Sequence, residues 1–164
     1  MEVIEEKPVR VRYAGFWLRF VAYLIDYLLL EIIGFIISIP FIGAIVFSAF
    51  TIAESNSFNE KTVFGIAGIL GAVFMLVIIT ILLGWLYFAL MESSKNQGTL
   101  GKMALGLKVT DMKGQRISFG RATGRYFGKI ISGMVFMIGY ILAGLTEKKQ
   151  ALHDMMAGCL VVRK

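Results

Sequence analysis

Residues 62–91 contain no Asp, Glu, Lys or Arg, and this uncharged run is the feature that most constrains the fold. A transmembrane helix needs about 20 consecutive, mostly apolar residues, and the run is longer than that. A helix on the surface of a soluble core would carry polar residues along one face, and the run has no such face. Composition agrees: the chain is 57% hydrophobic and 17% charged, against about 45–50% and about 25% in soluble domains. We therefore predict an integral membrane protein.

The first apolar segment, residues 14–53, carries only three charged residues. As one straight helix it would be about 60 Å long at 1.5 Å per residue, about twice the thickness of the hydrocarbon core. Pro40 and Gly43 lie where a break would fall. We therefore predict a first span over about 15–39, followed by a short apolar helix over about 41–53.

The second span is predicted over about 62–90. Loop 54–61, which precedes it, holds a single basic residue and two acidic ones, so we expect the loop on the outer side. Short cytoplasmic loops and tails of membrane proteins collect Lys and Arg. Three stretches rich in Lys and Arg are therefore predicted to be cytoplasmic: the tail 1–13, residues 92–125 and the tail 146–164.

The third hydrophobic segment, over about 119–145, allows more than one topology. If it crosses the membrane, the basic tail after it lies outside, against the charge distribution. A helix–break–helix hairpin that enters from the cytoplasm, broken near Gly133 or Gly139, would keep the tail inside. A fourth crossing made by residues 41–53 would do the same. We favour a cytoplasmic C-terminus and leave the route open.

The basic stretch before this segment contains the pattern of a small β element. Residues 107–110 and 115–118 flank a four-residue turn that contains Gly114, which is typical of a β-hairpin. A lone hairpin is marginally stable in water, and residues 160–163 are a candidate third strand. The predicted fold class is an all-α membrane protein, a small transmembrane helical bundle with a short cytoplasmic β-hairpin or three-stranded element. The chain is predicted to consist of the cytoplasmic N-terminal tail, residues 1–13, and a single transmembrane domain over residues 14–164.

Three polar residues of the first span lie on one face, because Arg19, Tyr23 and Asp26 are four and three residues apart. Arg19 is close enough to the cytoplasmic end to reach the lipid headgroups. Asp26 is predicted near the middle of the membrane, where an ionisable group is costly and marks a candidate functional site. It either forms a buried structural pair or binds a cation or a proton. Glu31 lies about 140° from Asp26 around the helix axis, and it either reaches the outer interface or lines a second face of the helix.

Two stripes run along the third segment. Small residues repeat every four positions and would let another helix approach closely: Gly120, Gly124, Gly128 and Ser132. A basic stripe runs beside them and consists of Arg121, Arg125 and Lys129. This stripe either anchors an interfacial amphipathic helix at the cytoplasmic surface or supplies a cation that neutralises Asp26 or Asp154.

Several classes of function are not supported by the sequence. The glycine-containing residues 98–102 lack the Gly and the Ser or Thr that a phosphate-binding loop needs at positions 96 and 103. His153 and Asp154 have no convincingly placed nucleophile, so we expect no enzyme. With one Cys and one His, we expect no metal site and no cofactor. The net charge of +6 is explained by membrane topology and anionic lipid, without nucleic acid.

Three ordered motifs resemble those of the RDD family of small membrane proteins. The opening motif is residues 14–26, AGFWLRFVAYLID, and the middle one comprises GTLGK and GLKV within residues 98–109. The closing one is residues 151–158, ALHDMMAG. The family is named for an arginine and two aspartates, which by motif fall on Arg19, Asp26 and Asp154. The resemblance implies a multipass membrane protein thought to transport ligands, with some members linked to sodium/proton antiport.

The functional hypothesis combines both arguments. We expect a transporter or ion-coupled permease subunit of the cell membrane, in which Asp26 binds a sodium ion or proton and Arg19 lowers the pKa of its carboxyl group. Asp154 would pair with a basic residue of the third segment. Because so few spans can hardly enclose a transport path within one chain, we expect a homo-oligomer. The alternative is a membrane interaction or assembly module in which Arg19, Asp26 and Asp154 form a structural charge clamp.

Overall fold

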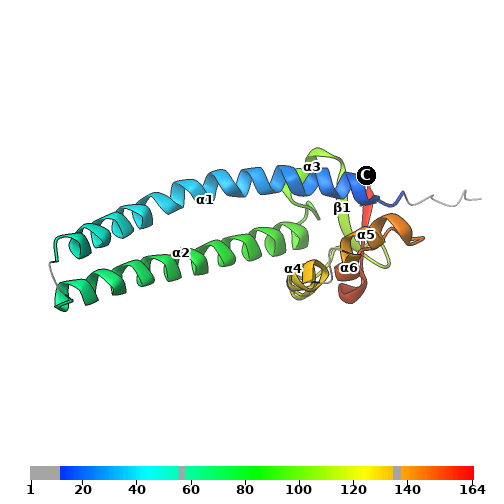
Figure 1. Ribbon diagram of the computed structural model, residues 1–164. Coiled ribbons are helices and arrows are strands. Elements are labelled where there is room, and N and C mark those ends of the chain that lie inside the picture. The colour runs from blue at the N-terminus through cyan, green and yellow to red at the C-terminus, as the bar shows by residue number, and fades with distance from the viewer. Residues whose placement is uncertain (1–11, 56–57, 135–137) are drawn as a thin grey trace, which may run out of the picture. The chain divides into compact units, whose positions relative to one another are not determined.

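The computed structural model describes residues 12–55, 58–134 and 138–164. The chain divides into two compact units (Figure 1). The hairpin unit is Asp26–Tyr87, and the terminal unit is Met1–Ile25 together with Phe88–Lys164. The fold is mostly helical, with two long apolar helices and a small two-stranded sheet, so the predicted fold class is confirmed.

The two long helices are α1, Phe16–Ala53, and α2, Glu60–Ser93, and both are long and apolar enough to cross a membrane. The predicted break near Pro40 is wrong, because α1 continues through this residue to Ala53. A proline inside a helix removes one backbone hydrogen bond. Ending the helix there would leave several more backbone groups without partners, which is costly away from water.

Small residues bring α1 and α2 close together within the hairpin unit. A methyl group on Gly65 of α2 would lie 2.5 Å from Cγ1 of Ile52 and 3.0 Å from the carbonyl oxygen of Ser48, both in α1. Such close approach is typical of helices that pack in lipid, where apolar side chains alone give little drive to associate. Most other side chains of the two helices are apolar and exposed, as contact with a bilayer requires.

The terminal unit contains the ends of the two long helices and six shorter elements. These are α3 (Leu100–Ala104), β1 (Leu107–Asp111), α4 (Phe119–Met134), α5 (Ile138–Leu145), α6 (Leu152–Ala157) and β2 (Cys159–Arg163). Its small apolar core forms where the sheet meets the helices. The fully buried members of that core include Leu107, Val109, Ile117, Ala122 and Val161.

The sheet pairs β1 with the C-terminal strand β2 in antiparallel register, from Leu107 opposite Arg163 to Asp111 opposite Cys159. The tail strand is therefore confirmed, whereas the predicted hairpin between 107–110 and 115–118 is wrong. The Asp111 carboxylate accepts hydrogen bonds from the backbone amides of residues 113 and 115, both at 2.8 Å. This Asx-type turn redirects the chain, and residues 115–118 form no strand.

The N-terminal segment before α1 also joins this sheet. Tyr13 forms an isolated antiparallel bridge with Val162, and the amide of Ala14 donates to the carbonyl of Val161 at 2.8 Å. Segments from the beginning, the middle and the end of the chain therefore share one small sheet.

The third hydrophobic segment forms two helices, α4 and α5, whose axes are bent by 98°. Gly133 and Gly139, the residues considered for the break, lie in α4 and α5, and residues 135–137 lie outside the described chain. The Tyr140 hydroxyl of α5 donates to the carbonyl of Lys129 in α4 at 3.0 Å. The two helices are thus tied to one another rather than continuous.

The helix contact predicts a difference between two glycines of α2. Gly65→Ala should be less stable than Gly71→Ala by about 1–3 kcal/mol, because overpacking at a close contact costs about that much. Both substitutions raise helix propensity by the same amount. A methyl group on Gly71 would meet nothing within 4 Å, whereas one on Gly65 would meet α1. Thermal unfolding of the two variants in detergent measures the difference. Equal stability would contradict the packing.

Candidate functional site

Asp26 is buried in the hairpin unit and accepts a hydrogen bond from the Tyr87 hydroxyl at 2.7 Å. Only 1% of its surface is exposed. Asp26 lies in the N-terminal third of α1 and Tyr87 in the C-terminal quarter of α2, so the pair forms near the open end of the hairpin. The expectation that Asp26 lies in the middle of a span depended on a break at Pro40, which α1 does not have.

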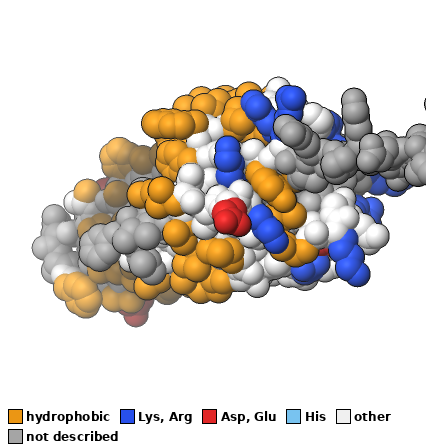
Figure 2. Space-filling view, turned by 90° about the vertical axis from the view of Figure 1, so that its right-hand side faces the viewer, with side chains coloured by type: hydrophobic (Ala, Val, Ile, Leu, Met, Phe, Trp, Pro, Cys, Tyr) orange, Lys and Arg blue, Asp and Glu red, His pale blue; other side chains and the backbone are white. Residues whose placement is uncertain are grey.

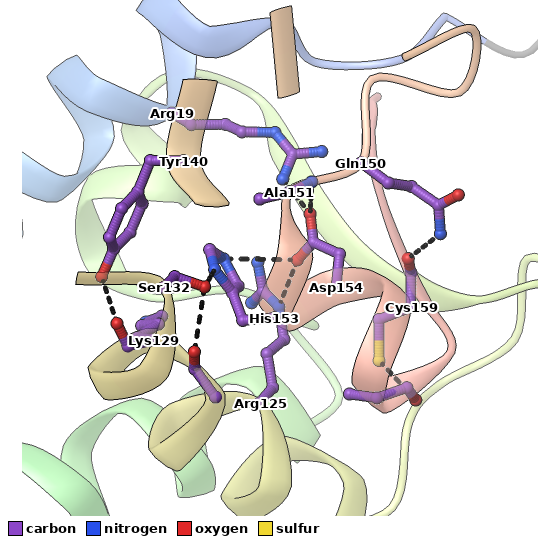
Figure 3. A network of polar contacts seen from close by, with 12 residues as sticks. Arg19, Arg125, Lys129, Ser132, Tyr140, Gln150, Ala151, His153, Asp154 and Cys159 are labelled. Carbon is purple, nitrogen blue, oxygen red and sulfur yellow. Dashed lines mark hydrogen bonds and ion pairs between the residues drawn. The ribbon is translucent and has the colours of Figure 1, made fainter. Parts of the chain in front are cut away.

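A second buried polar group, the charge cluster, lies in the terminal unit and centres on Arg125 of α4. Its Nε donates to Oδ1 of Asp154 in α6 at 2.7 Å, and its Nη1 donates to Oε2 of Glu92 at the end of α2 at 2.6 Å. All three residues are at most 2% exposed. One guanidinium therefore links two carboxylates from different helices (Figure 3 shows Asp154 and Arg125).

Three further cations complete the charge cluster. Arg19 of α1 binds the other carboxylate oxygen of Asp154 and also donates to the carbonyl of Ala14 at 2.8 Å. Lys102 of α3 forms an ion pair with Glu92. The Lys129 ammonium lies 4.0 Å from Oε1 of Glu92 and 3.8 Å from the centre of the Phe88 ring. These contacts join five helices through their charged side chains: α1, α2, α3, α4 and α6.

The closing motif positions Asp154 and His153 at the start of α6. Asp154 accepts a hydrogen bond from the Ala151 amide at 3.1 Å, and Gly158 ends the helix in the left-handed conformation. Burial by itself raises the pKa of Asp154, but the adjacent Arg125 and Arg19 outweigh burial and hold it well below its usual range. The two guanidiniums thus favour the ionised form of Asp154.

His153 is neutral at physiological pH. Burial lowers the pKa of its imidazole to about 3, against the opposing effect of Asp154. Nδ1 lies 3.3 Å from the Ser132 hydroxyl in α4, and the ring packs 5.2 Å from that of Tyr140. The imidazole therefore contacts α4 and α5 without adding charge to the cluster (Figure 3).

The residues of the predicted polar column lie on one helix, α1, and have different described surroundings. Arg19 engages Asp154 in the terminal unit, Asp26 engages Tyr87 in the hairpin unit, and the side chain of Tyr23 is about half exposed. Glu31 is exposed. Arg19 therefore contributes to the charge cluster.

The stripes of the third segment lie side by side on α4, and both contribute buried residues. In the basic stripe, Arg125 and Lys129 join the charge cluster, and Arg121 donates to the carbonyls of Ala157 and Gly158 at the end of α6. Among the small residues, Gly128 packs against His153, and a methyl group on Gly120 or Gly124 would meet nothing within 4 Å. The side of α4 that carries the basic residues thus faces the rest of the terminal unit.

Sequence reasoning missed three residues of these two groups: Glu92, Lys102 and Tyr87. Glu92 is the first charge after the uncharged run, and Lys102 closes the GTLGK motif. A buried cation needs a nearby anion, so the excess of basic residues around Asp154 was a signal for a second carboxylate. Tyr87 lies within the uncharged run, and only the pairing of the long helices brings it to Asp26.

Comparison with known proteins gives one family and two relatives. The model of the RDD family matches residues 13–158. The uncharacterized protein YxaI of Bacillus subtilis (strain 168) is 41% identical over 97% of this chain and 99% of its own length. The uncharacterized membrane protein YteJ of the same organism is 29% identical over 93% of this chain and 82% of its own length. No solved structure matches the chain.

The charge cluster predicts unequal effects for two arginines of α4. Arg125→Gln should lower the free energy of unfolding by about 3–5 kcal/mol, since it removes the shared partner of two buried carboxylates. Arg121→Gln is the matched control, because Arg121 is exposed and binds only backbone carbonyls in the contacts described for it. Thermal unfolding in detergent checks both, and equal losses would show that Arg125 does not hold the cluster together.

Proposed function

Because the chain belongs to the RDD family of membrane proteins, we propose that it is a subunit of an ion-coupled membrane transporter with Asp26 as the cation or proton site. The observation that carries the proposal is the buried carboxylate of Asp26 in an otherwise apolar helical hairpin. Ionisable groups in such surroundings are expensive and are typical of ion pathways and proton relays. The proposal assigns the chain no enzymatic reaction.

Tyr87 gives the Asp26 carboxylate a partner that can be exchanged. A neutral hydroxyl stabilises the ionised carboxylate less than a cation would, so a sodium ion or a proton can compete for it. Asp154, in contrast, is bound by two guanidiniums. The two aspartates of the family motifs thus have different described partners, a hydroxyl for Asp26 and two guanidiniums for Asp154.

The hairpin unit supplies two helices, which are too few to enclose a path for an ion. A homo-oligomer would bring several hairpins together, and the largely apolar outer surface of α1 and α2 is compatible with contact to both lipid and further copies. We therefore include a homo-oligomer of the cell membrane in the proposal.

A second candidate function is a membrane interaction or assembly module. It is favoured by the charge cluster, in which Arg19 and Asp154 clamp the start of α1 to α6. A transporter can contain the same clamp, so the cluster is compatible with either function. The two candidates differ in whether the protein by itself moves an ion.

The sheet supports an orientation in which both termini lie on one side. Residues 13–14, β1 and β2 are hydrogen-bonded neighbours, and a membrane cannot separate paired strands. Two crossings, by α1 and α2, satisfy this condition, and α4 with α5 then makes no net crossing. By the excess of Lys and Arg, we assign this side to the cytoplasm.

The transport proposal predicts a flux that depends on Asp26. The purified chain in liposomes should change the interior pH after a sodium or potassium jump, as followed with an enclosed pH-sensitive dye. Asp26→Asn should reduce this flux to background, because the variant cannot exchange a proton or offer a negative charge. Tyr87→Phe should keep the flux but alter its dependence on pH, since it removes the hydroxyl donor.

Glu31→Gln is the matched control, an exposed carboxylate of the same helix, and it should retain the flux. An equal flux in Asp26→Asn would rule out Asp26 as the ion site. A parent protein without flux would contradict the transporter and favour the assembly module.

The orientation predicts which introduced thiols an impermeant maleimide reaches on intact cells. Cys159 is buried, and burial raises its pKa, so a Cys159→Ala background suits the measurement. In that background Asn59→Cys, in the loop between the long helices, should be labelled directly. Lys164→Cys should be labelled only after permeabilisation. Labelling of both in intact cells, or the reverse pattern, would contradict the assignment.

A further inference from the structure

The helix α4 has an inverted amphipathic arrangement within the terminal unit. The buried residues are Ala122, Arg125, Gly128 and Ser132. The exposed apolar residues lie on the opposite side at helical spacing: Phe119, Phe127, Ile130, Ile131 and Met134. A helix packed on a water-soluble unit would show the reverse, with apolar residues inside and charges in water.

All three basic residues of α4 are engaged by the terminal unit itself. Arg121 binds the end of α6, Arg125 binds two carboxylates, and Lys129 lies over the Phe88 ring. The face of α4 opposite its buried residues contains Gly, Thr and Tyr besides its apolar residues, and no charge, because the exposed Arg121 lies on the side that faces α6. This face therefore needs an apolar environment.

We propose that α4 lies in the plane of the membrane interface, with its exposed apolar face among the lipid chains of the leaflet next to the terminal unit. The unit contains the ends of both long helices, so no linker separates it from the bilayer. Its exposed basic residues are suited to anionic headgroups, and they include Lys95, Lys113, Arg116, Lys148, Lys149 and Lys164. Figure 2 shows Lys and Arg side chains beside apolar ones on the face that it presents.

A crossing by α4 is disfavoured on three grounds. Its length of about 24 Å is less than the hydrocarbon core of about 30 Å. The 98° bend before α5 prevents the pair from forming one straight span. A single crossing would also separate β2 from its partner β1.

The proposal is tested by the membrane depth of nitroxide labels on the full chain. Single cysteines replace Phe119, Phe127, Ile130 and Met134 in a Cys159→Ala background, and each labelled protein is placed in vesicles of phosphatidylethanolamine and phosphatidylglycerol. Collision with oxygen, which prefers lipid, is compared with collision with a water-soluble nickel chelate. Arg116→Cys, exposed and outside α4, is the matched control in water.

All four labels on α4 should collide with oxygen, be shielded from nickel and lie at a similar shallow depth, while Arg116→Cys meets nickel. A depth that changes steadily along the helix, by about 22 Å from 119 to 134 at 1.5 Å per residue, would mean that α4 spans the membrane. Nickel access at all four sites would place the face in water. Shielding from both reagents, with coupling between labels, would mean that a second copy covers it. Each of these three results overturns the proposal.

Each variant should elute at the parent volume in size-exclusion chromatography, which shows that it is folded. Four labelled positions also guard against a local effect of any single substitution. The result does not depend on Asp26, so a failure here leaves the ion site untouched.

Discussion

The two hydrogen bonds of Arg125 are the interaction on which the terminal unit depends. They join Asp154 at the start of α6 to Glu92 at the end of α2. A charge removed from water must be paired, and removing one member of such a group leaves the others buried without compensation. The sheet and the glycine-ended α6 hold Asp154 in place, so local backbone structure and long-range charge pairing support each other.

This arrangement separates structure from candidate function. Arg19 and Asp154 hold the terminal unit together, whereas Asp26 lies in the hairpin unit and accepts a hydrogen bond from the Tyr87 hydroxyl. Two guanidiniums beside a carboxylate favour its ionised form, which suits Asp154 to a structural role. Of the three charged residues for which the family is named, two thus belong to the charge cluster and one, Asp26, belongs to the hairpin unit.

Much of the architecture followed from hydrophobic patterning. The uncharged run over 62–91 and the apolar segment over 14–53 predicted the two long helices, because length and apolar composition suffice to specify a membrane helix. The break at Pro40 and the hairpin after β1 were wrong for related reasons. Both were inferred from local signals, and a continuing helix and a distant strand satisfied more backbone hydrogen bonds than the local alternatives did.

The sequence by itself determined that this chain enters a membrane, that its basic residues gather outside the long helices, and that Asp26 and Asp154 are unusual. Only the tertiary structure decided which charges meet. Glu92 and Lys102 reach the charge cluster, and the basic stripe of α4 faces inward with its apolar face exposed. The physical reason is that spacing along a helix fixes which residues share a face, whereas the partner of that face depends on how distant segments pack.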